Sequence, residues 1–275
     1  MSAERLTLMA VHAHPDDEAT GTGGVLAKAA AEGIRTVLVT CTDGRCGDGP
    51  DGVKPGEPGH DPLAVAEFRR AELDTSCALL GIESLELLGY ADSGMVGSAS
   101  NDAAGSFWST PLDESAGRLA ELIDRYRPDV VVTYDENGFY GHPDHIQAHR
   151  VTMAAVAIAG TASKVYWTTV PRSAMAEFGR MAREQGLIPA DAPELTEMPD
   201  FGVPDDEVTT WVDVRKFAER KRAAMAAHAS QSDSAMFLQM PPEMFSTVMG
   251  LETFVRVQDT TGASLPEDDL FAGLR

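Results

Sequence analysis

Short apolar runs alternate with segments of helical composition along the first part of the chain. Residues 6–13 and 35–40 are nearly continuous apolar runs, a pattern typical of strands buried on both faces of a sheet. Between them, residues 23–33 are rich in alanine and end at Gly33, which predicts a helix. A strand, a helix and a second strand in this order favour a parallel sheet.

The same alternation continues to about residue 170. Helices are predicted over residues 62–80, 112–126 and 143–160, and strands over residues 84–88, 129–134 and 165–170. Pro62 and Pro143 stand at predicted helix starts, where proline is tolerated. Residues 43–62 and 89–111 are predicted to be long loops, and loops of this length in a compact domain are usually functional or mobile.

Beyond residue 171 the pattern is weaker. Helices are predicted over residues 173–185, 216–229 and 241–249, strands over residues 208–214 and 251–257, and a proline-rich acidic loop over residues 188–206. Residues 216–222 indicate a solvated helix face, and the polar residues from Asp259 onward are expected to fray.

These elements together predict an α/β fold with a Rossmann-like, mostly parallel sheet flanked by helices. We expect residues 1–170 to form the catalytic core. Residues 171–275 are expected to form a smaller α+β portion that completes the same domain and the substrate pocket.

Composition and charge narrow the class of partner. Apolar residues make up 43% of the 275 residues, enough for a core. The formal charge of −21 argues against nucleic acid and against anionic membranes, since both attract basic surfaces. No secretion signal is visible, and no apolar run reaches the roughly 18 residues of a spanning helix, so a cytoplasmic protein is expected. The three cysteines match no paired zinc spacing and predict no disulfide framework.

Two clusters of histidine, proline and aspartate each follow a predicted strand. The first is HAHPDDE at residues 12–18, and the second is YGHPDH at residues 140–145. A sheet begun by three alternating strands and helices commonly has the strand order 3-2-1-4, and such sheets bind ligands where the order reverses. The first cluster leaves strand 1 and the second leaves strand 4, so the two are expected to face each other.

The residue types in these clusters suit a catalytic zinc, which keeps three protein ligands and one open position. His14, Asp17 and His145 would supply two imidazoles and one carboxylate. Asp16, beside Asp17, would then act on the water as general base. The reverse assignment of the two aspartates stays open, and the same ligand set also suits Fe(II).

Nearby residues are candidates for supporting roles or rival ligands. His142 or Tyr140 could donate to the oxyanion that develops during amide hydrolysis. Asp144 could fix the tautomer of His142 or His14. His12 and His149 are rival metal ligands, disfavoured because they would lie deeper in the sheet and along the helix.

Two other sequence patterns do not indicate a functional site. The glycines of residues 21–24 invite comparison with a dinucleotide-binding loop, but the last position of that fingerprint is Leu26, and an acidic cluster stands where the pyrophosphate would lie. Cys46 has no histidine near it in the sequence and is not predicted to be a nucleophile.

At these clusters the sequence resembles the PIG-L/LmbE-like N-acetylglucosaminyl deacetylase superfamily. The resemblance rests on AHPDDE at residues 13–18 and HPDH at residues 142–145; it covers residues 5–160 well and residues 216–231 more loosely. The flanks VHAHPDDE, VTCT, DSGM and TYDENGFYGHPDH are similar to the mycothiol-pathway branch. That branch contains the N-acetylglucosaminyl-inositol deacetylase and the mycothiol S-conjugate amidase.

The resemblance implies an LmbE-like fold, the same three zinc ligands and the same base. It further implies His142 as oxyanion stabiliser or acid, Tyr140 as a mobile donor on the carbonyl side, and Asp144 as the orienting carboxylate. Arg69 and Asp92 match positions expected to hold the sugar and inositol hydroxyls.

The expected function is zinc-dependent hydrolysis of the N-acetyl group of a GlcNAc-containing small molecule, similar to GlcNAc-inositol. The branch carries a Gly-Glu-Glu-Gly-like turn after VTCT, whereas this chain has GRCG at residues 44–47. An S-conjugate-type amidase and a deacetylase of a GlcNAc-bearing secondary metabolite therefore stay open. A metal-binding or sugar-binding module without catalysis is disfavoured: a purely structural zinc should be closed by four protein ligands, and the presence of Asp16 beside Asp17 speaks against that. A homo-oligomer is compatible with the sequence.

Overall fold

A computed structural model describes residues 5–50, 52–189, 202–232 and 234–275. Within these residues the strands are β1 (Thr7–His12), β2 (Arg35–Thr42), β3 (Ser84–Tyr90), β4 (Val130–Tyr134), β5 (Lys164–Thr169), β6 (Thr210–Asp213) and β7 (Leu251–Asp259). The helices are α1 (Asp17–Ala31), α2 (Pro62–Leu80), α3 (Leu112–Tyr126), α4 (Gly138–Gly141), α5 (Pro143–Ala159), α6 (Arg172–Glu184), α7 (Ala218–Ala227), α8 (Ala235–Gln239) and α9 (Pro242–Met249).

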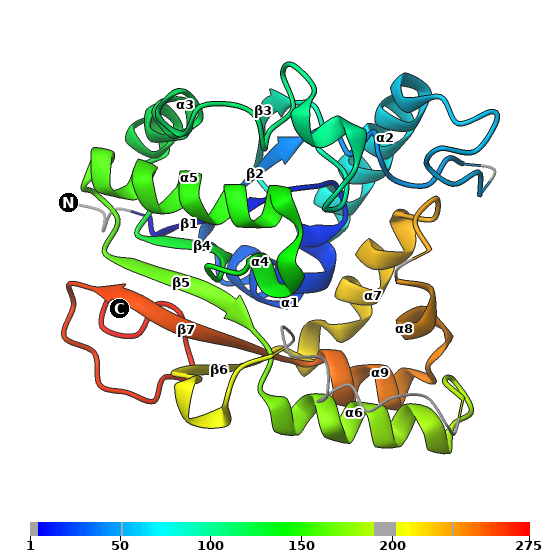
Figure 1. The fold of residues 1–275 in the computed structure, drawn as a ribbon. Coiled ribbons are helices and arrows are strands. Elements are labelled where there is room, and N and C mark those ends of the chain that lie inside the picture. Colours follow the sequence, from blue (N-terminus) through cyan, green and yellow to red (C-terminus); the bar gives the residue numbers. More distant parts are fainter. Residues whose placement is uncertain (1–4, 51, 190–201, 233) are drawn as a thin grey trace.

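The strands form one sheet in the order β3-β2-β1-β4-β5-β7-β6 (Figure 1). The pairs among β1 to β5 are parallel, and β7 runs antiparallel to both β5 and β6. The predicted α/β class and the predicted order 3-2-1-4 are therefore confirmed. The strand order reverses between β1 and β4, the place where sheets of this kind bind ligands.

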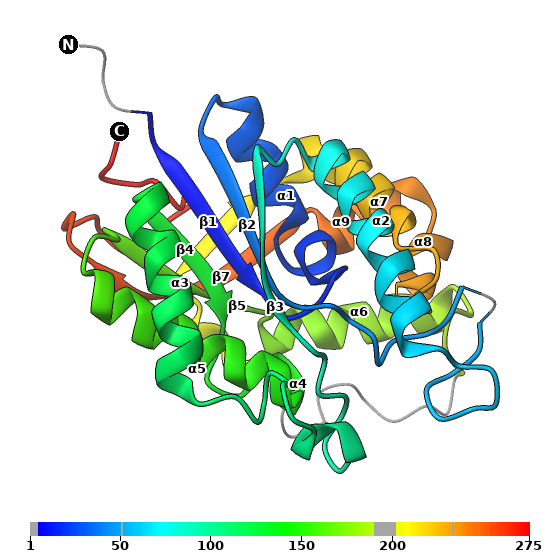
Figure 2. The ribbon, with the colours of Figure 1, turned by 90° about the horizontal axis from the view of Figure 1, so that it is seen from above.

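Two apolar cores lie on opposite faces of this sheet. On β1, Leu8 and Ala10 face the core shared with α1, α2 and α7, while Met9 and Val11 face the core shared with α3 and α5. Figure 2 shows these two groups of helices on either side of the strands. Because successive side chains of a strand point to opposite faces, burial on both faces requires an unbroken apolar run, which the sequence shows.

The first helix starts earlier than predicted. α1 begins at Asp17 rather than at residue 23. Asp17 and Glu18 occupy its first turn, where negative charge is favourable at the positive end of the helix dipole. The glycines of residues 21–24 interrupt the apolar periodicity and so conceal this first part of the helix in the sequence.

Those glycines make room for a buried ion pair. Glu252 on β7 accepts hydrogen bonds from the backbone N–H groups of Gly24 (2.7 Å) and Val25 (2.8 Å) and pairs with the Lys221 ammonium at 2.7 Å. A Cβ atom at Gly24 would lie 2.3 Å from Val214 Cγ2. The prediction that residues 216–222 form a solvated face is thus wrong at Lys221, which is 2% exposed.

We expect Lys221→Met to lower the free energy of unfolding by about 3–5 kcal/mol, because the Glu252 carboxylate would lose its buried counter-charge. Lys216→Met, a change of the same type at an exposed position, should stay within about 0.5 kcal/mol. Denaturant unfolding of both variants measures the difference. Equal effects of the two changes would show that the buried pair contributes no specific stability.

The prediction of a fraying C-terminal segment is wrong as well. Glu267 is buried and accepts hydrogen bonds from Tyr166 Oη (2.8 Å) and Arg256 Nη1 (2.7 Å), and it pairs with Lys164. Leu270 is also buried. Glu267 compensates the positive charges of Lys164 and Arg256 on the sheet. The polar composition of this segment resembles that of a solvated tail, so composition does not reveal the burial.

The remaining predictions concern the loop over residues 188–206, the membrane and the boundary at residue 170. Residues 190–201, most of the predicted loop over 188–206, lie outside the described residues. Among the helices of the described residues, none combines the length and the apolar character that crossing a membrane requires. β6 and β7 come from beyond residue 171 and extend the sheet that contains β1; the boundary at residue 170 stays a prediction.

Candidate metal centre

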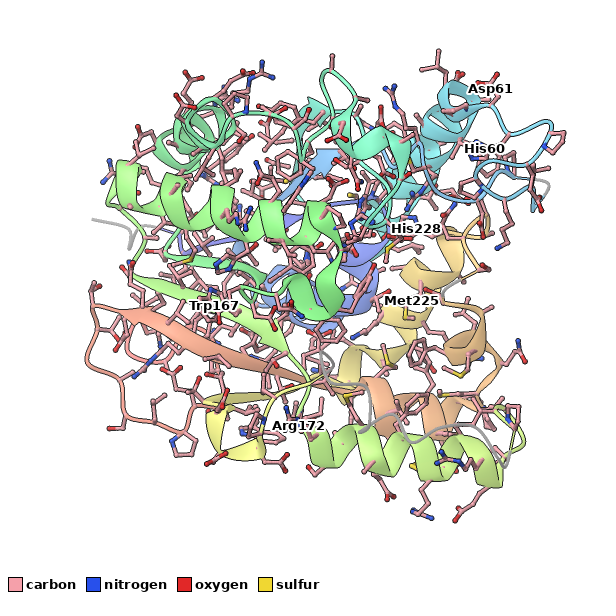
Figure 3. All side chains as sticks on the ribbon, viewed as in Figure 1. His60, Asp61, Trp167, Arg172, Met225 and His228 are labelled. Carbon is pink, nitrogen blue, oxygen red and sulfur yellow. The ribbon has the colours of Figure 1, made fainter. Side chains whose placement is uncertain are left out.

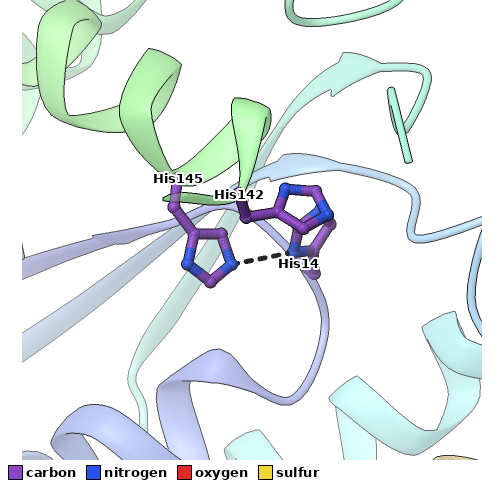
Figure 4. Close-up of side chains that lie close together, drawn as sticks. All are labelled: His14, His142 and His145. Carbon is purple, nitrogen blue, oxygen red and sulfur yellow. Dashed lines mark hydrogen bonds between the residues drawn. The ribbon is translucent and has the colours of Figure 1, made fainter. Parts of the chain in front are cut away.

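The two clusters of the sequence meet at the reversal between β1 and β4. His14 follows the end of β1, and His145 lies in the first turn of α5, which follows β4. His145 Nε2 is 3.2 Å from His14 Nδ1, the contact drawn in Figure 4. The two clusters, about 130 residues apart in the sequence, thus lie side by side, as expected.

Three atoms of these clusters have the spacing of a tetrahedral site. Asp17 Oδ2 lies 3.4 Å from His14 Nδ1 and 3.5 Å from His145 Nε2, and the two nitrogens are 3.2 Å apart. Zinc bonds to nitrogen and oxygen of about 2.0–2.1 Å in a tetrahedron place ligand atoms about 3.3–3.4 Å apart. The donor set therefore fits zinc in both chemistry and spacing.

Two other sets also have ligand atoms within 4.8 Å of one another. They are His14 with His142 and His145, and His14 with Asp92 and Asp144. The second set uses the opposite ring nitrogen, since Asp144 Oδ2 and Asp92 Oδ1 lie 3.2 Å and 3.6 Å from His14 Nε2. The set with Asp17 is the one expected from the sequence, and its three distances match one tetrahedron; which set holds a metal stays a prediction.

The backbone and the buried carboxylates orient both imidazoles. His145 Nδ1 is 3.2 Å from the carbonyl oxygen of Gly138, which directs Nε2 at the metal position. Gly138 has φ +63°, and a Cβ there would lie 2.6 Å from His145 Cβ, so this position requires glycine. Asp144, held by the Ser93 N–H at 2.8 Å, places its carboxylate on His14 Nε2 and leaves Nδ1 for the metal.

The adjacent aspartates have separate partners. Asp17 Oδ2 accepts from the His14 N–H and from Tyr134 Oη, both at 2.8 Å. The Asp16 side chain instead lies 3.1 Å from Arg69 Nη2. Burial raises the pKa of Asp16 to about 7, against the opposing charge of Arg69. This division favours Asp17 as ligand and Asp16 as base.

Arg69 is almost fully enclosed by the protein. It donates to the carbonyl oxygens of Gly44 (2.6 Å) and Pro15 (2.5 Å) besides its contact with Asp16. A Cβ atom at either Gly44 or Gly47 would lie 2.5 Å from its Nη1 atom, so the glycines of the GRCG turn seat the guanidinium. These bonds position Asp16, and a direct contact of Arg69 with substrate stays a prediction.

Asp92 is buried and bonded to the backbone of two neighbouring loops. It is 4% exposed and accepts hydrogen bonds from the N–H groups of Gly94 (2.8 Å) and Cys46 (3.1 Å). Its role toward substrate hydroxyls stays a prediction. Burial raises the pKa of the Cys46 thiol to about 11, in agreement with its assignment as non-catalytic.

His142 and Tyr140 stand beside the metal position. The His142 ring centroid is 4.6 Å from that of His14, and the Tyr140 centroid is 5.0 Å from that of His145. Burial lowers the pKa of His142 to about 2, so the ring is neutral. The Asp144 N–H donates to His142 Nδ1 at 3.1 Å, which leaves the proton of the neutral ring on Nε2.

The rival ligands are engaged elsewhere. His12 Nε2 lies 2.8 Å from Thr22 Oγ1, and His149 Nδ1 lies 3.0 Å from the Tyr134 carbonyl oxygen. Tyr134 itself was not among the predicted site residues. Its hydroxyl contacts Asp17 and the Ala13 N–H, and its position as the last residue of β4, next to the second cluster, is the only sequence signal for it.

Known proteins resemble this chain over nearly its full length. The 1D-myo-inositol 2-acetamido-2-deoxy-alpha-D-glucopyranoside deacetylase of Salinispora arenicola is 42% identical over 97% of this chain and 91% of its own length. The deacetylase of the same name from Acidothermus cellulolyticus is 41% identical over 98% and 95%. The N,N'-diacetylchitobiose deacetylase structure from Pyrococcus horikoshii shares the fold, with a TM-score of 0.57, 21% identity and coverage of 91% and 83%.

A family model described as PIG-L, GlcNAc-PI de-N-acetylase, matches residues 9–156, which include both clusters. The resemblance and the enzyme class expected from the sequence are thereby confirmed. This chain belongs to the PIG-L family of N-deacetylases.

Proposed function

We propose that the protein is a zinc-dependent deacetylase that removes the N-acetyl group of a GlcNAc-inositol conjugate and releases acetate and a free amine. The observation that carries this proposal is the set of His14 Nδ1, Asp17 Oδ2 and His145 Nε2 within 3.2–3.5 Å of one another. A second carboxylate, that of Asp16, directly precedes Asp17 in the sequence and is held by Arg69. The named activity of the two bacterial relatives supports the substrate class.

His14, Asp17 and His145 would hold the ion. When bound, zinc supplies a Lewis acid that activates water and polarises the amide carbonyl. Both histidines are oriented for this task by protein oxygens, those of Asp144 and Gly138. Fe(II) accepts the same ligands, so metal analysis of the purified protein identifies the ion in use.

Asp16 takes the proton of the attacking water and later delivers it to the leaving amine. A base whose pKa lies near the operating pH is best suited to both steps. Burial raises the pKa of the Asp16 carboxyl to about 7, which is near that pH. Arg69 fixes the direction of the carboxylate. Asp16 and Asp17 thus divide the work between proton transfer and metal binding.

His142 stabilises the oxyanion that develops on the acetyl carbonyl. Its Nδ1 accepts the Asp144 N–H, so the neutral ring presents Nε2–H as a donor. Tyr140 lies beside His142 and His145, with ring centroids at 6.1 and 5.0 Å, and we propose its hydroxyl as a second donor on the carbonyl side. Arg69 and Asp92 are the proposed contacts for the sugar and inositol hydroxyls.

A side-by-side assay of three amides tests the substrate class. We expect release of acetate from the N-acetylglucosaminyl-inositol conjugate, at a rate at least about tenfold above that for a cysteinyl-glucosamine amide of the same inositol or for a GlcNAc bearing another aglycone. Preferential cleavage of the cysteinyl amide would make the protein an S-conjugate-type amidase. Preference for another aglycone would follow from the GRCG turn at residues 44–47, and no acetate from any of them would refute the proposal.

A further inference from the structure

The backbone of Asp16 is held in an unfavourable conformation. Asp16 has φ 114° and ψ −28°, in the left-handed half of conformational space that residues other than glycine rarely occupy. Such a conformation persists only where surrounding contacts determine it. The contacts that hold Asp16 therefore decide where its carboxylate points.

One of these contacts is a buried carboxylate two residues away. The Asp16 N–H donates to Glu18 Oε2 at 2.9 Å. Glu18 lies on α1 and is fully buried. Its second carboxylate oxygen, Oε1, accepts a hydrogen bond from Ser76 Oγ on α2 at 2.5 Å and contacts His228 Nε2 at 2.7 Å. A buried carboxylate is stable only when it is paired and hydrogen-bonded.

His228 comes from the far end of the chain. It caps α7, 210 residues after Glu18, and is 2% exposed (Figure 3). Its Nδ1 atom has no hydrogen-bond partner among the described residues, so Glu18 is the polar anchor of the ring. The turn that follows is fixed too, because Ser230 donates through its N–H and its hydroxyl to Glu72 on α2 at 2.8 and 2.7 Å.

We propose that Glu18 and His228 form a positioning pair for the base Asp16. His228 fixes the Glu18 carboxylate, and Glu18 in turn fixes the Asp16 backbone in its left-handed conformation. The proposal rests on the proposed function, in which Asp16 acts on the water. Through this pair the C-terminal part of the chain sets the position of a catalytic group that lies in the first cluster.

Four variants test the pair. His228→Leu removes the contact, and His228→Gln restores a donor at the place of Nε2. Lys221→Met is the matched control, since Lys221 lies on the same helix, is also buried and also pairs with a carboxylate, but has no contact with Asp16. Ser76→Ala removes a second hydrogen bond to Glu18, and it tests the pair if His228→Leu does not fold.

We expect His228→Leu to lower kcat by about 10²-fold, the effect of a catalytic group displaced by about 1 Å. KM and the zinc content of one ion per chain should not change, because neither the substrate nor the ligands are touched. His228→Gln should recover most of kcat, and Ser76→Ala should lower it in part. Lys221→Met should lose stability in denaturant while its kcat stays near the wild-type value.

A double-mutant cycle separates this proposal from the proposed function. In the Asp16→Asn background, His228→Leu should cost little further kcat, because the group that it positions no longer acts. Additive losses, a kcat of His228→Leu no lower than that of Lys221→Met, loss of zinc in His228→Leu, or no recovery in His228→Gln would each overturn the positioning pair. Wild-type protein that releases no acetate, or Asp16→Asn with wild-type kcat, would instead refute the proposed function.

Discussion

Asp16→Asn is expected to retain one zinc ion per chain and to lose about 10³-fold in kcat, within the range that positioned acid–base groups contribute. The amide keeps the shape of the carboxylate but cannot take a proton from water. Asparagine tolerates the left-handed backbone at φ 114°, so the change should leave the local fold intact. Metal analysis and initial rates of acetate release measure the two effects.

Asp74→Asn is the control for this change. Asp74 makes an exposed ion pair with Arg70 on α2, and the same substitution there should leave kcat unaltered. Asp17→Asn should differ in losing the ion, and with it turnover. If Asp16→Asn lost zinc and Asp17→Asn kept it, the roles of the two aspartates would be reversed; a wild-type kcat for Asp16→Asn would rule out its role as base.

His14→Ala is expected to abolish turnover by removing the metal. The His14 Nδ1 atom is one of three proposed ligands, and its Nε2 side contacts the buried Asp144 carboxylate. Loss of a ligand should weaken zinc affinity by more than the roughly 10²-fold that loss of an orienting group costs. Competition with a chelator of known affinity gives the dissociation constant of each variant.

The matched control is another histidine of the same region. His149 lies on α5 after His145, and its Nδ1 is bonded to the Tyr134 carbonyl oxygen. We expect His149→Ala to bind zinc with wild-type affinity. Tight zinc binding by His14→Ala, or loss of zinc in His149→Ala, would mean that the ligand set differs from the one assigned.

The meeting of the two clusters could be predicted from the sequence because its information is local. Strands β1, β2 and β4 are buried on both faces and therefore appear as apolar runs, and the crossovers between them restrict the strand order. Once that order is known, the ends of β1 and β4 must be neighbours. Each cluster follows one of these ends directly.

The supporting contacts could not be predicted in the same way. Glu18 and His228 are 210 residues apart, and neither carries a local signal of the other. Lys221 lies in a segment whose charges resemble those of a solvated helix face. Its partner Glu252 lies on β7, 31 residues further along the chain. Such pairs depend on how elements pack, and helical or strand periodicity does not record which polar residue will find a buried partner.

Titration of zinc into metal-free wild-type protein, with acetate release from the N-acetylglucosaminyl-inositol conjugate as the readout, tests most directly that both clusters build one catalytic metal centre. We predict no acetate from the metal-free protein and a linear rise in rate that ends at one zinc ion per chain. Turnover without metal, a rise that continues to two ions per chain, or full zinc occupancy without acetate release would contradict this account.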